Sequence, residues 1–218
     1  MKKLLLGIAA VCLAGFTFAQ DAPLWMRHSV ISPDGTTIAF TYKGDIYTVP
    51  VAGGRAMQIT TNPAYDTAPV WSPDSKRIAF ASDRMGSLDV YIVAKDGGEP
   101  RRLTTHSGSE TPLAFTDAGH VLFSAGIMPS AEAVVFPFNG QFNQVYRVSV
   151  EGGRPTMISS MPMECISINK EGAMLYQDKK GYEDYWRKHH VSPIARDIWM
   201  YTPGKEPQYR QLTTFGGE

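Results

Sequence analysis

The string SPDGTTIAF, from Ser32 to Phe40, decides the fold because it recurs along the chain. It returns as SPDSKRIAF (72–80), more loosely as FTDAGHVLF (115–123), and distantly as INKEGAMLY (168–176). Ser-Pro-Asp-Gly is typical of a type I turn, since serine is favoured first, proline presets φ at the second position and glycine suits the fourth. The short apolar run behind each turn then predicts a strand that is covered on both faces.

Two further elements follow each string in the same order. The first is a polar residue, then Ile or Val, then an aromatic residue, as in DIY (45–47), DVY (89–91), QVY (144–146) and DIW (197–199). The second is a short strand that ends in Leu or Ile plus hydroxyl residues. In the first three units it follows a glycine pair at 53–54, 97–98 and 152–153. Such pairs supply the positive φ that a hairpin needs.

A unit of four short strands that repeats at this spacing predicts the blade of a propeller. The third position of the recurring string advances by 40, 43 and 53 residues from one unit to the next. A sandwich would also show evenly spaced strands, but it would not repeat one motif in the same order. We therefore predict an all-β fold, a β-propeller with about four blades of four antiparallel strands, at about 27–61, 62–105, 106–159 and 160–214.

The N-terminal segment, residues 1–19, predicts a secretory signal peptide. Two lysines precede an apolar run at 4–18, and cleavage is predicted between Ala19 and Gln20. An uncleaved membrane anchor would be short, because a span needs about 20 apolar residues. Lipidation at Cys12 is disfavoured by the bulky valine before it. We expect a periplasmic or secreted protein with no membrane association beyond export.

The predicted mature part, residues 20–218, has a charge close to neutral. The whole chain carries 21 Lys and Arg against 21 Asp and Glu, which argues against a nucleic-acid-binding protein. Cys165 is the one cysteine outside the signal segment, so an internal disulfide is excluded. With no basic partner near it in sequence, Cys165 is expected to be a buried structural residue. No cofactor is expected.

The elements SPDG-x-x-IAF, D-[IV]-[YW] and GG-x-x-x-x-LT resemble the WD-repeat-like repeats of several propellers. These are the TolB protein, tricorn protease, and the prolyl oligopeptidase and dipeptidyl peptidase group. TolB-like proteins place an α/β domain before the propeller, whereas the first repeat here begins shortly after the signal segment. Dipeptidyl-peptidase-like enzymes carry a Gly-x-Ser-x-Gly nucleophile elbow, and no such string occurs in the 218 residues.

The segment GYEDYWRKHHVSPIARDIWMY (181–201) resembles a stretch in the first propeller of bacterial tricorn-like serine peptidases. In that exported family, propellers precede a PDZ module and a peptidase domain of the C-terminal-processing class. The resemblance implies a propeller that guides or gates peptides, or unfolded protein segments, toward a catalytic domain absent from this chain. No family catalytic residue has a counterpart here, so whether the chain belongs to an enzyme stays open.

Propellers of this family close with six or seven blades, so the resemblance also implies an incomplete propeller that is truncated after the fourth repeat. Its partners would then include the remaining blades and the PDZ and peptidase domains. The alternative is a stand-alone periplasmic binding or scaffold propeller of TolB-like type, without enzymatic activity.

The same segment holds the candidate substrate-binding residues Tyr185, Trp186, Arg187, His189 and His190. Arginine offers forked donors to a carboxylate, and tryptophan offers a flat face to a peptide. Alternatively, these aromatic residues pack the segment onto neighbouring blades while the charges face water. No metal site is expected, because a site needs at least three convergent ligands and adjacent side chains in extended structure diverge.

Two pairs of polar residues are interpreted as structural. Asp83 and Arg84 follow the second apolar strand and are expected to cap backbone donors between strands. Ser32 and Ser72 are expected to be turn residues rather than nucleophiles, because no histidine is expected beside their hydroxyl groups to activate them.

Overall fold

Sixteen β-strands make up the regular structure of the described part of the chain. The computed structural model describes residues 25–127, 143–178 and 196–214. Within these ranges the strands form four antiparallel sheets of four strands each, and every sheet uses four consecutive strands. We number the sheets blade 1 to blade 4 in chain order. The same ranges hold no helix that is long and apolar enough to cross a membrane.

The strands of a blade follow one another in space in the order of the chain. Blades 1 and 2 consist of β1 (Arg27–Ile31), β2 (Thr37–Tyr42), β3 (Asp45–Pro50), β4 (Met57–Gln58), β5 (Asp66–Trp71), β6 (Arg77–Ser82), β7 (Asp89–Ala94) and β8 (Arg101–Arg102). Blades 3 and 4 consist of β9 (Glu110–Asp117), β10 (His120–Ala125), β11 (Gln144–Ser149), β12 (Thr156–Ser159), β13 (Met163–Ile168), β14 (Met174–Asp178), β15 (Ile198–Thr202) and β16 (Gln208–Gln211).

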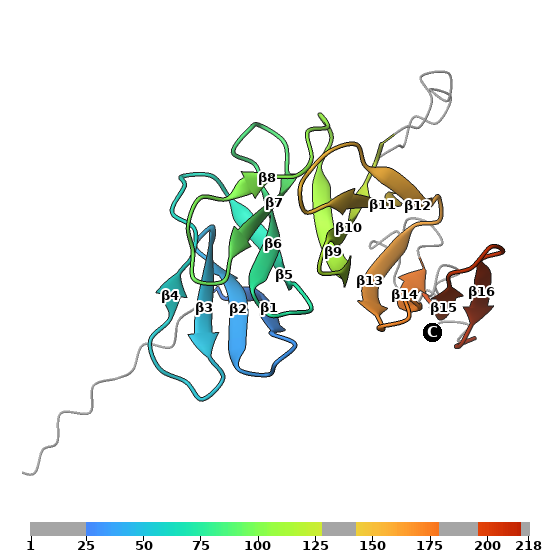
Figure 1. Cartoon of the computed structure of the whole chain (residues 1–218), viewed down its shortest axis with the longest axis horizontal. Coiled ribbons are helices and arrows are strands. Elements are labelled where there is room, and N and C mark those ends of the chain that lie inside the picture. The colour runs from blue at the N-terminus through green and yellow to red at the C-terminus, as the bar shows by residue number, and fades with distance from the viewer. Residues whose placement is uncertain (1–24, 128–142, 179–195, 215–218) are drawn as a thin grey trace, which may run out of the picture.

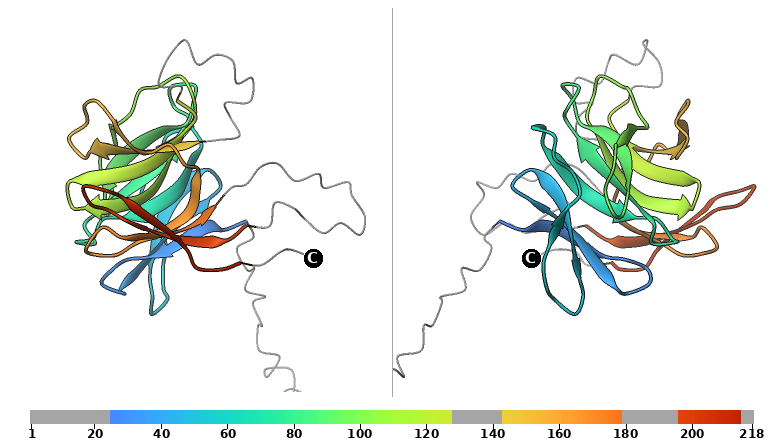
Figure 2. Two further views of the ribbon diagram at one scale, coloured as in Figure 1. Left: turned by 90° about the vertical axis from the view of Figure 1, so that its right-hand side faces the viewer. Right: turned by 60° about the vertical axis from the view of Figure 1, so that its left-hand side comes forward.

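The blades stand side by side along an open arc (Figures 1 and 2). The first strands of successive blades contact one another, β1 with β5, β5 with β9, and β9 with β13. The short fourth strands lie on the outer side of the arc, away from this line of contacts (Figure 1). This arrangement is that of a β-propeller whose axis runs along the first strands, which confirms the predicted fold.

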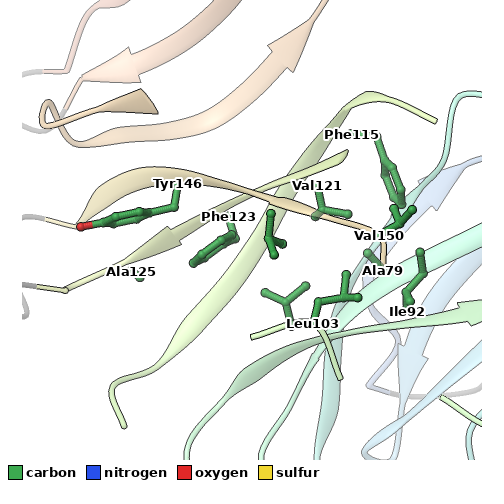
Figure 3. Packing of buried hydrophobic residues seen from close by; sticks show 11 residues of the cluster. Ala79, Ile92, Leu103, Phe115, Val121, Phe123, Ala125, Tyr146 and Val150 are labelled. Atoms are coloured by element: carbon green, nitrogen blue, oxygen red, sulfur yellow. The ribbon is translucent and has the colours of Figure 1, made fainter. Parts of the chain in front are cut away.

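Apolar cores lie between the blades, because alternate residues of a middle strand face opposite neighbours. In β6, Ile78 and Phe80 pack toward blade 1, and Ala79 packs toward blade 3. Figure 3 shows the core between blades 2 and 3, where Phe123 and Val121 of blade 3 approach the residues of blade 2. A blade therefore depends on both neighbours to cover its two faces.

One face of blade 4 has no such cover. Leu175, Ile198 and Leu212 are 43%, 47% and 43% exposed. Their counterparts in blade 2, at the same positions of the repeat, are Ala79, Val90 and Leu103, which are at most 3% exposed. The uncovered positions confirm that the described blades form an incomplete propeller.

In blades 1 and 2 the turn before the second strand has the predicted geometry. In blade 1, the Gly35 amide donates to the Ser32 carbonyl oxygen over 2.8 Å, and Gly35 takes a φ of 71°. In blade 2, Ser75 takes the glycine position with a φ of 57°, which is costly for a residue with a side chain. Its hydroxyl compensates by accepting a hydrogen bond from the Asp34 amide of blade 1 over 3.1 Å.

The other two recurring elements, Asp-Ile-Tyr and the strand that ends in hydroxyl residues, are joined by hydrogen bonds that we call the clamp. The Thr60 hydroxyl accepts the Ile46 amide over 3.0 Å and donates to the Asp45 carboxylate, while Gln58 donates to the other oxygen of Asp45. The hydroxyl-to-amide bond recurs at 2.9 Å in blades 2 and 4, from Val90 to Thr104 and from Ile198 to Thr213. This clamp holds the outer strand of the blade, which is only two residues long in blades 1 and 2.

We expect Thr60→Val to destabilise the fold, because it leaves the buried Ile46 amide without an acceptor. The loss in the free energy of unfolding should be about 1–3 kcal/mol, measured by urea denaturation. Thr61→Val is the matched control, since Thr61 is exposed and the change there should stay within about 0.5 kcal/mol. Equal effects at the two positions would contradict the clamp.

Candidate functional site

A hollow of about 560 Å³ opens at the axis, where the first strands of all four blades end. Its lining alternates between strand ends and the turns that follow them: Val30, Ile31, Pro33, Val70, Trp71, Pro73, Leu113, Ala114, Phe115, Thr116, Asp117, Ile168, Asn169 and Lys170. The repeat places these residues together because every Ser-Pro-Asp-type turn follows a first strand. We call this space the axial hollow.

The wall of the axial hollow is mainly apolar, with a few polar groups. The Trp71 indole N–H donates to the Val30 carbonyl oxygen over 3.2 Å, which fixes the ring across the boundary between two blades. Burial opposes ionisation of Asp117, but hydrogen bonds from the His120 ring and the Gly119 amide outweigh it and lower the pKa of this carboxyl. Asp117 and the ammonium of Lys170 thus place one charge of each sign at the hollow.

The first strands carry bulges that sequence reasoning missed. His28, Ala68 and Cys165 have φ values of 50°, 51° and 52°, and the pairing register shifts at each of them. A bulge leaves backbone groups outside the ladder, so they remain able to bind another chain. The expected burial of Cys165 is wrong: its thiol is exposed, because the residue stands at a bulge of a first strand.

A second group of functional interest is a carboxylate at the start of a first strand. Asp66, the first residue of β5, is fully buried, and both its oxygens accept from Arg84 at 3.0 and 3.1 Å. Asp83 accepts the Tyr65 amide over 2.7 Å and so caps a backbone donor as predicted. The prediction for Arg84 is wrong, because its guanidinium pairs with a carboxylate rather than with the backbone.

Glu110 occupies the corresponding position at the start of β9 and is also fully buried. Among the described residues, neither of its carboxyl oxygens makes a hydrogen bond of normal geometry, although the side chains of Thr104 and Asp89 lie close to them. Burial and the nearby negative charge of Asp89 raise the pKa of Glu110 to about 7, although Thr104 and Arg102 oppose the shift. The Arg102 guanidinium lies 2.9 Å from the Asp89 carboxylate. The two buried carboxyl groups, those of Asp89 and Glu110, therefore share the guanidinium of Arg102.

The predicted peptide contacts Tyr185, Trp186, Arg187, His189 and His190 lie outside the described residues, and so do Ala19 and Gln20. In residues 25–127, 143–178 and 196–214, no group of three or more His, Cys, Asp or Glu is arranged to hold a metal ion.

Blades in an open arc, with first strands that converge on an axial hollow, define an incomplete β-propeller. Residues 23–218 match the family of the tricorn protease N-terminal β-propeller domain, and the chain belongs to this family. Tricorn protease homolog 1 of Streptomyces coelicolor is 35% identical over 184 residues, which cover 82% of this chain and 16% of that protein.

Solved structures share the fold. The tricorn protease aligns with 90% of this chain and 19% of its own, with a TM-score of 0.67 and 18% identity. A protein described as a putative TolB from Agrobacterium tumefaciens aligns with 88% of this chain and 66% of its own, with a TM-score of 0.62 and 23% identity. The chain thus spans less than a fifth of the length of the tricorn-type relatives.

We expect the stability of the protein to fall as pH rises from about 4.5 to about 7, because folded Glu110 keeps a proton that the unfolded chain releases. Glu110→Gln should remove this dependence and raise the free energy of unfolding at pH 8 by on the order of 2 kcal/mol, with little change at pH 5. Urea denaturation at both pH values measures the effect.

Asp66→Asn is the control for this experiment, because Asp66 is paired. It should lower stability at pH 8, since it leaves the mostly buried Arg84 without its carboxylate. A comparable loss in Glu110→Gln would contradict the assignment of Glu110 as an unpaired acid.

Proposed function

We propose that this chain is the propeller part of an exported tricorn-like serine peptidase and that it guides peptides to a catalytic domain outside the chain. The observation that carries the proposal is the axial hollow, in which the first strands of four blades present apolar side chains to one space. Family membership and the relation to tricorn protease homolog 1 support the link to a peptidase.

The chemistry of the hollow suits a peptide in an extended conformation. Ile31 and Lys170 are exposed at its wall, and the bulged first strands leave backbone groups that another chain can pair with. Apolar contacts then hold side chains of many kinds, while Asp117 and Lys170 bind polar groups. Peptides or unfolded protein segments are therefore the proposed ligands, in the periplasm or outside the cell.

Isolation of the native protein from its host, with an antibody against these repeats, tests the peptidase proposal. We expect a species much heavier than the 24.0 kDa of this chain, with peptide hydrolysis that a serine-reactive inhibitor abolishes. A species of about this mass without hydrolysis would instead favour a stand-alone scaffold propeller, the alternative that the likeness to TolB structures supports.

A photoreactive amino acid at Ile31 of the full-length protein tests the role of the axial hollow. Ile31 lines the hollow and is 58% exposed, so we expect it to crosslink to unstructured peptides. The control position is Met85, which is 65% exposed but does not line the hollow, and it should give several-fold less crosslinking. Equal labelling at the two positions would overturn the proposal. The same probe at Trp186 tests the proposed peptide contacts at Tyr185 to His190.

A further inference from the structure

The boundary between blades 1 and 2 and the boundary between blades 2 and 3 have the same plan, but they differ in where the guanidinium group comes from. Three positions correspond in kind: Asp66 and Glu110, Phe80 and Phe123, Tyr91 and Tyr146. The fourth does not. Ser82-Asp83-Arg84, at the end of β6, corresponds to Ala125-Gly126-Ile127, at the end of β10, so an isoleucine stands where blade 2 has its arginine.

In blade 2, Arg84 fills the room between an acid and two aromatic rings. Its guanidinium carbon lies 4.5 Å from the centre of the Tyr91 ring and 5.7 Å from that of Phe80. The same guanidinium holds both oxygens of Asp66. Forked donors that meet a carboxylate while the planar face lies on an aromatic ring are a strong arrangement for a guanidinium in a buried site.

In blade 3 the acid and the rings remain. Phe123 and Tyr146 stack with ring centres 5.7 Å apart, close to the 6.0 Å of Phe80 and Tyr91 (Figure 3). Ile127 packs against this core, and the space beside it is a hollow of about 480 Å³, against about 250 Å³ at the corresponding place by Arg84. Glu110, Tyr146 and Ile127 all line this space, which we call the interblade hollow.

Arg102 does not take the place of the missing arginine. At each boundary one of two neighbouring carboxylates is paired with a guanidinium, but Arg102 comes from β8 and pairs with Asp89, whereas Arg84 pairs with Asp66. In the blade 1 counterpart, Gln58 makes that contact, to Asp45. Within the part of the chain that the structure describes, Glu110 is therefore buried with no guanidinium hydrogen-bonded to its carboxyl group. The segment that follows Ile127, residues 128–142, contains neither lysine nor arginine.

We propose that the interblade hollow binds the guanidinium group of an arginine side chain from a peptide or protein ligand, with Glu110 as its carboxylate partner. The ligand takes the role that Arg84 plays inside blade 2, and it turns a costly unpaired acid into a buried, doubly hydrogen-bonded pair. The site lies between blades 2 and 3, apart from the axial hollow, and it does not depend on the chain being part of a peptidase.

Other charged groups at the interblade hollow modulate this site. Asp89 and Arg102 lie beside Glu110, and Arg154 and His106 line the hollow. Arg154 is exposed, so its repulsion of a bound cation is screened by water. Its guanidinium can also pair with a carboxylate of the ligand.

Calorimetric titration of the full-length protein with N-acetyl-L-arginine amide at pH 8 tests the proposal. This probe carries the guanidinium without a free ammonium or carboxylate. We expect saturable binding, and at least about tenfold weaker binding of the citrulline analogue, which has the same shape but no charge. Free arginine is titrated in parallel, and tighter binding of free arginine than of the capped residue would overturn the assignment to a peptide side chain. No binding of the capped probe at 10 mM would overturn the proposal as a whole.

Two variants locate the binding. Glu110→Gln should weaken binding of the capped arginine at least about tenfold, because it removes the charge that pairs with the guanidinium. Ile127→Arg should abolish binding and raise the melting temperature, because it supplies the internal arginine that blade 2 already has. Thermal unfolding of both variants verifies that they fold, and Asp66→Asn, at the occupied counterpart site, should leave the affinity unchanged if it folds. Unchanged affinity in Glu110→Gln would contradict the proposal.

The pH dependence gives a further readout. Because the pKa of Glu110 is raised to about 7, the acid must lose its proton to pair, so affinity should fall about tenfold per pH unit below 7 and level off above it. Protonation of His106 at the rim would act in the same direction. His106→Gln separates the two, since the pH dependence should persist in this variant and vanish in Glu110→Gln.

Discussion

The structure depends on the mutual burial of blade faces. A four-stranded sheet has no interior of its own, so the apolar residues on its two faces leave water only when a neighbouring blade covers them. Side chains along a strand point alternately to its two faces, so Ala79 and Ile78, which are adjacent in sequence, belong to different interblade cores. The clamp of Asp45 and Thr60 holds the short outer strand to the rest of blade 1, and the bond from Asp34 to Ser75 ties neighbouring turns.

The fold could be predicted well from the sequence, because short motifs in each propeller repeat determine the turns and strand pairings within a blade. The Ser-Pro-Asp turn, the glycine pairs and the hydroxyl residues at the end of each unit all make contacts within a few strands. Thr60 and Ile46, for example, are near in sequence and belong to one sheet. The four-blade arrangement followed from counting these motifs. The chain's membership in the tricorn propeller family agrees with the resemblance that the motifs had suggested.

The candidate sites were less accessible to sequence reasoning, since they form between repeats. The axial hollow combines residues as distant as Ile31 and Lys170, which no local pattern connects. The bulge at Cys165 exposes a thiol that was expected to be buried because no basic partner lies near it in sequence. The signal for the interblade hollow was present in the sequence, as the change from Ser-Asp-Arg to Ala-Gly-Ile. This change could be interpreted only from the structure, which shows that Arg84 contacts Asp66, the counterpart of Glu110.

Because each blade contacts only its neighbours, the boundaries between blades can change in sequence independently of one another during evolution. The two boundaries of blade 2 keep the same backbone plan and aromatic stack, yet one is filled by its own arginine and the other is left open around Glu110. Substitutions far apart in such an array act almost independently on its stability. One or two substitutions at a boundary can therefore create, remove or alter a binding pocket there. The other boundaries continue to stabilise the array. In an array of this kind, duplication of a repeat adds a boundary between blades at which a new ligand preference can evolve.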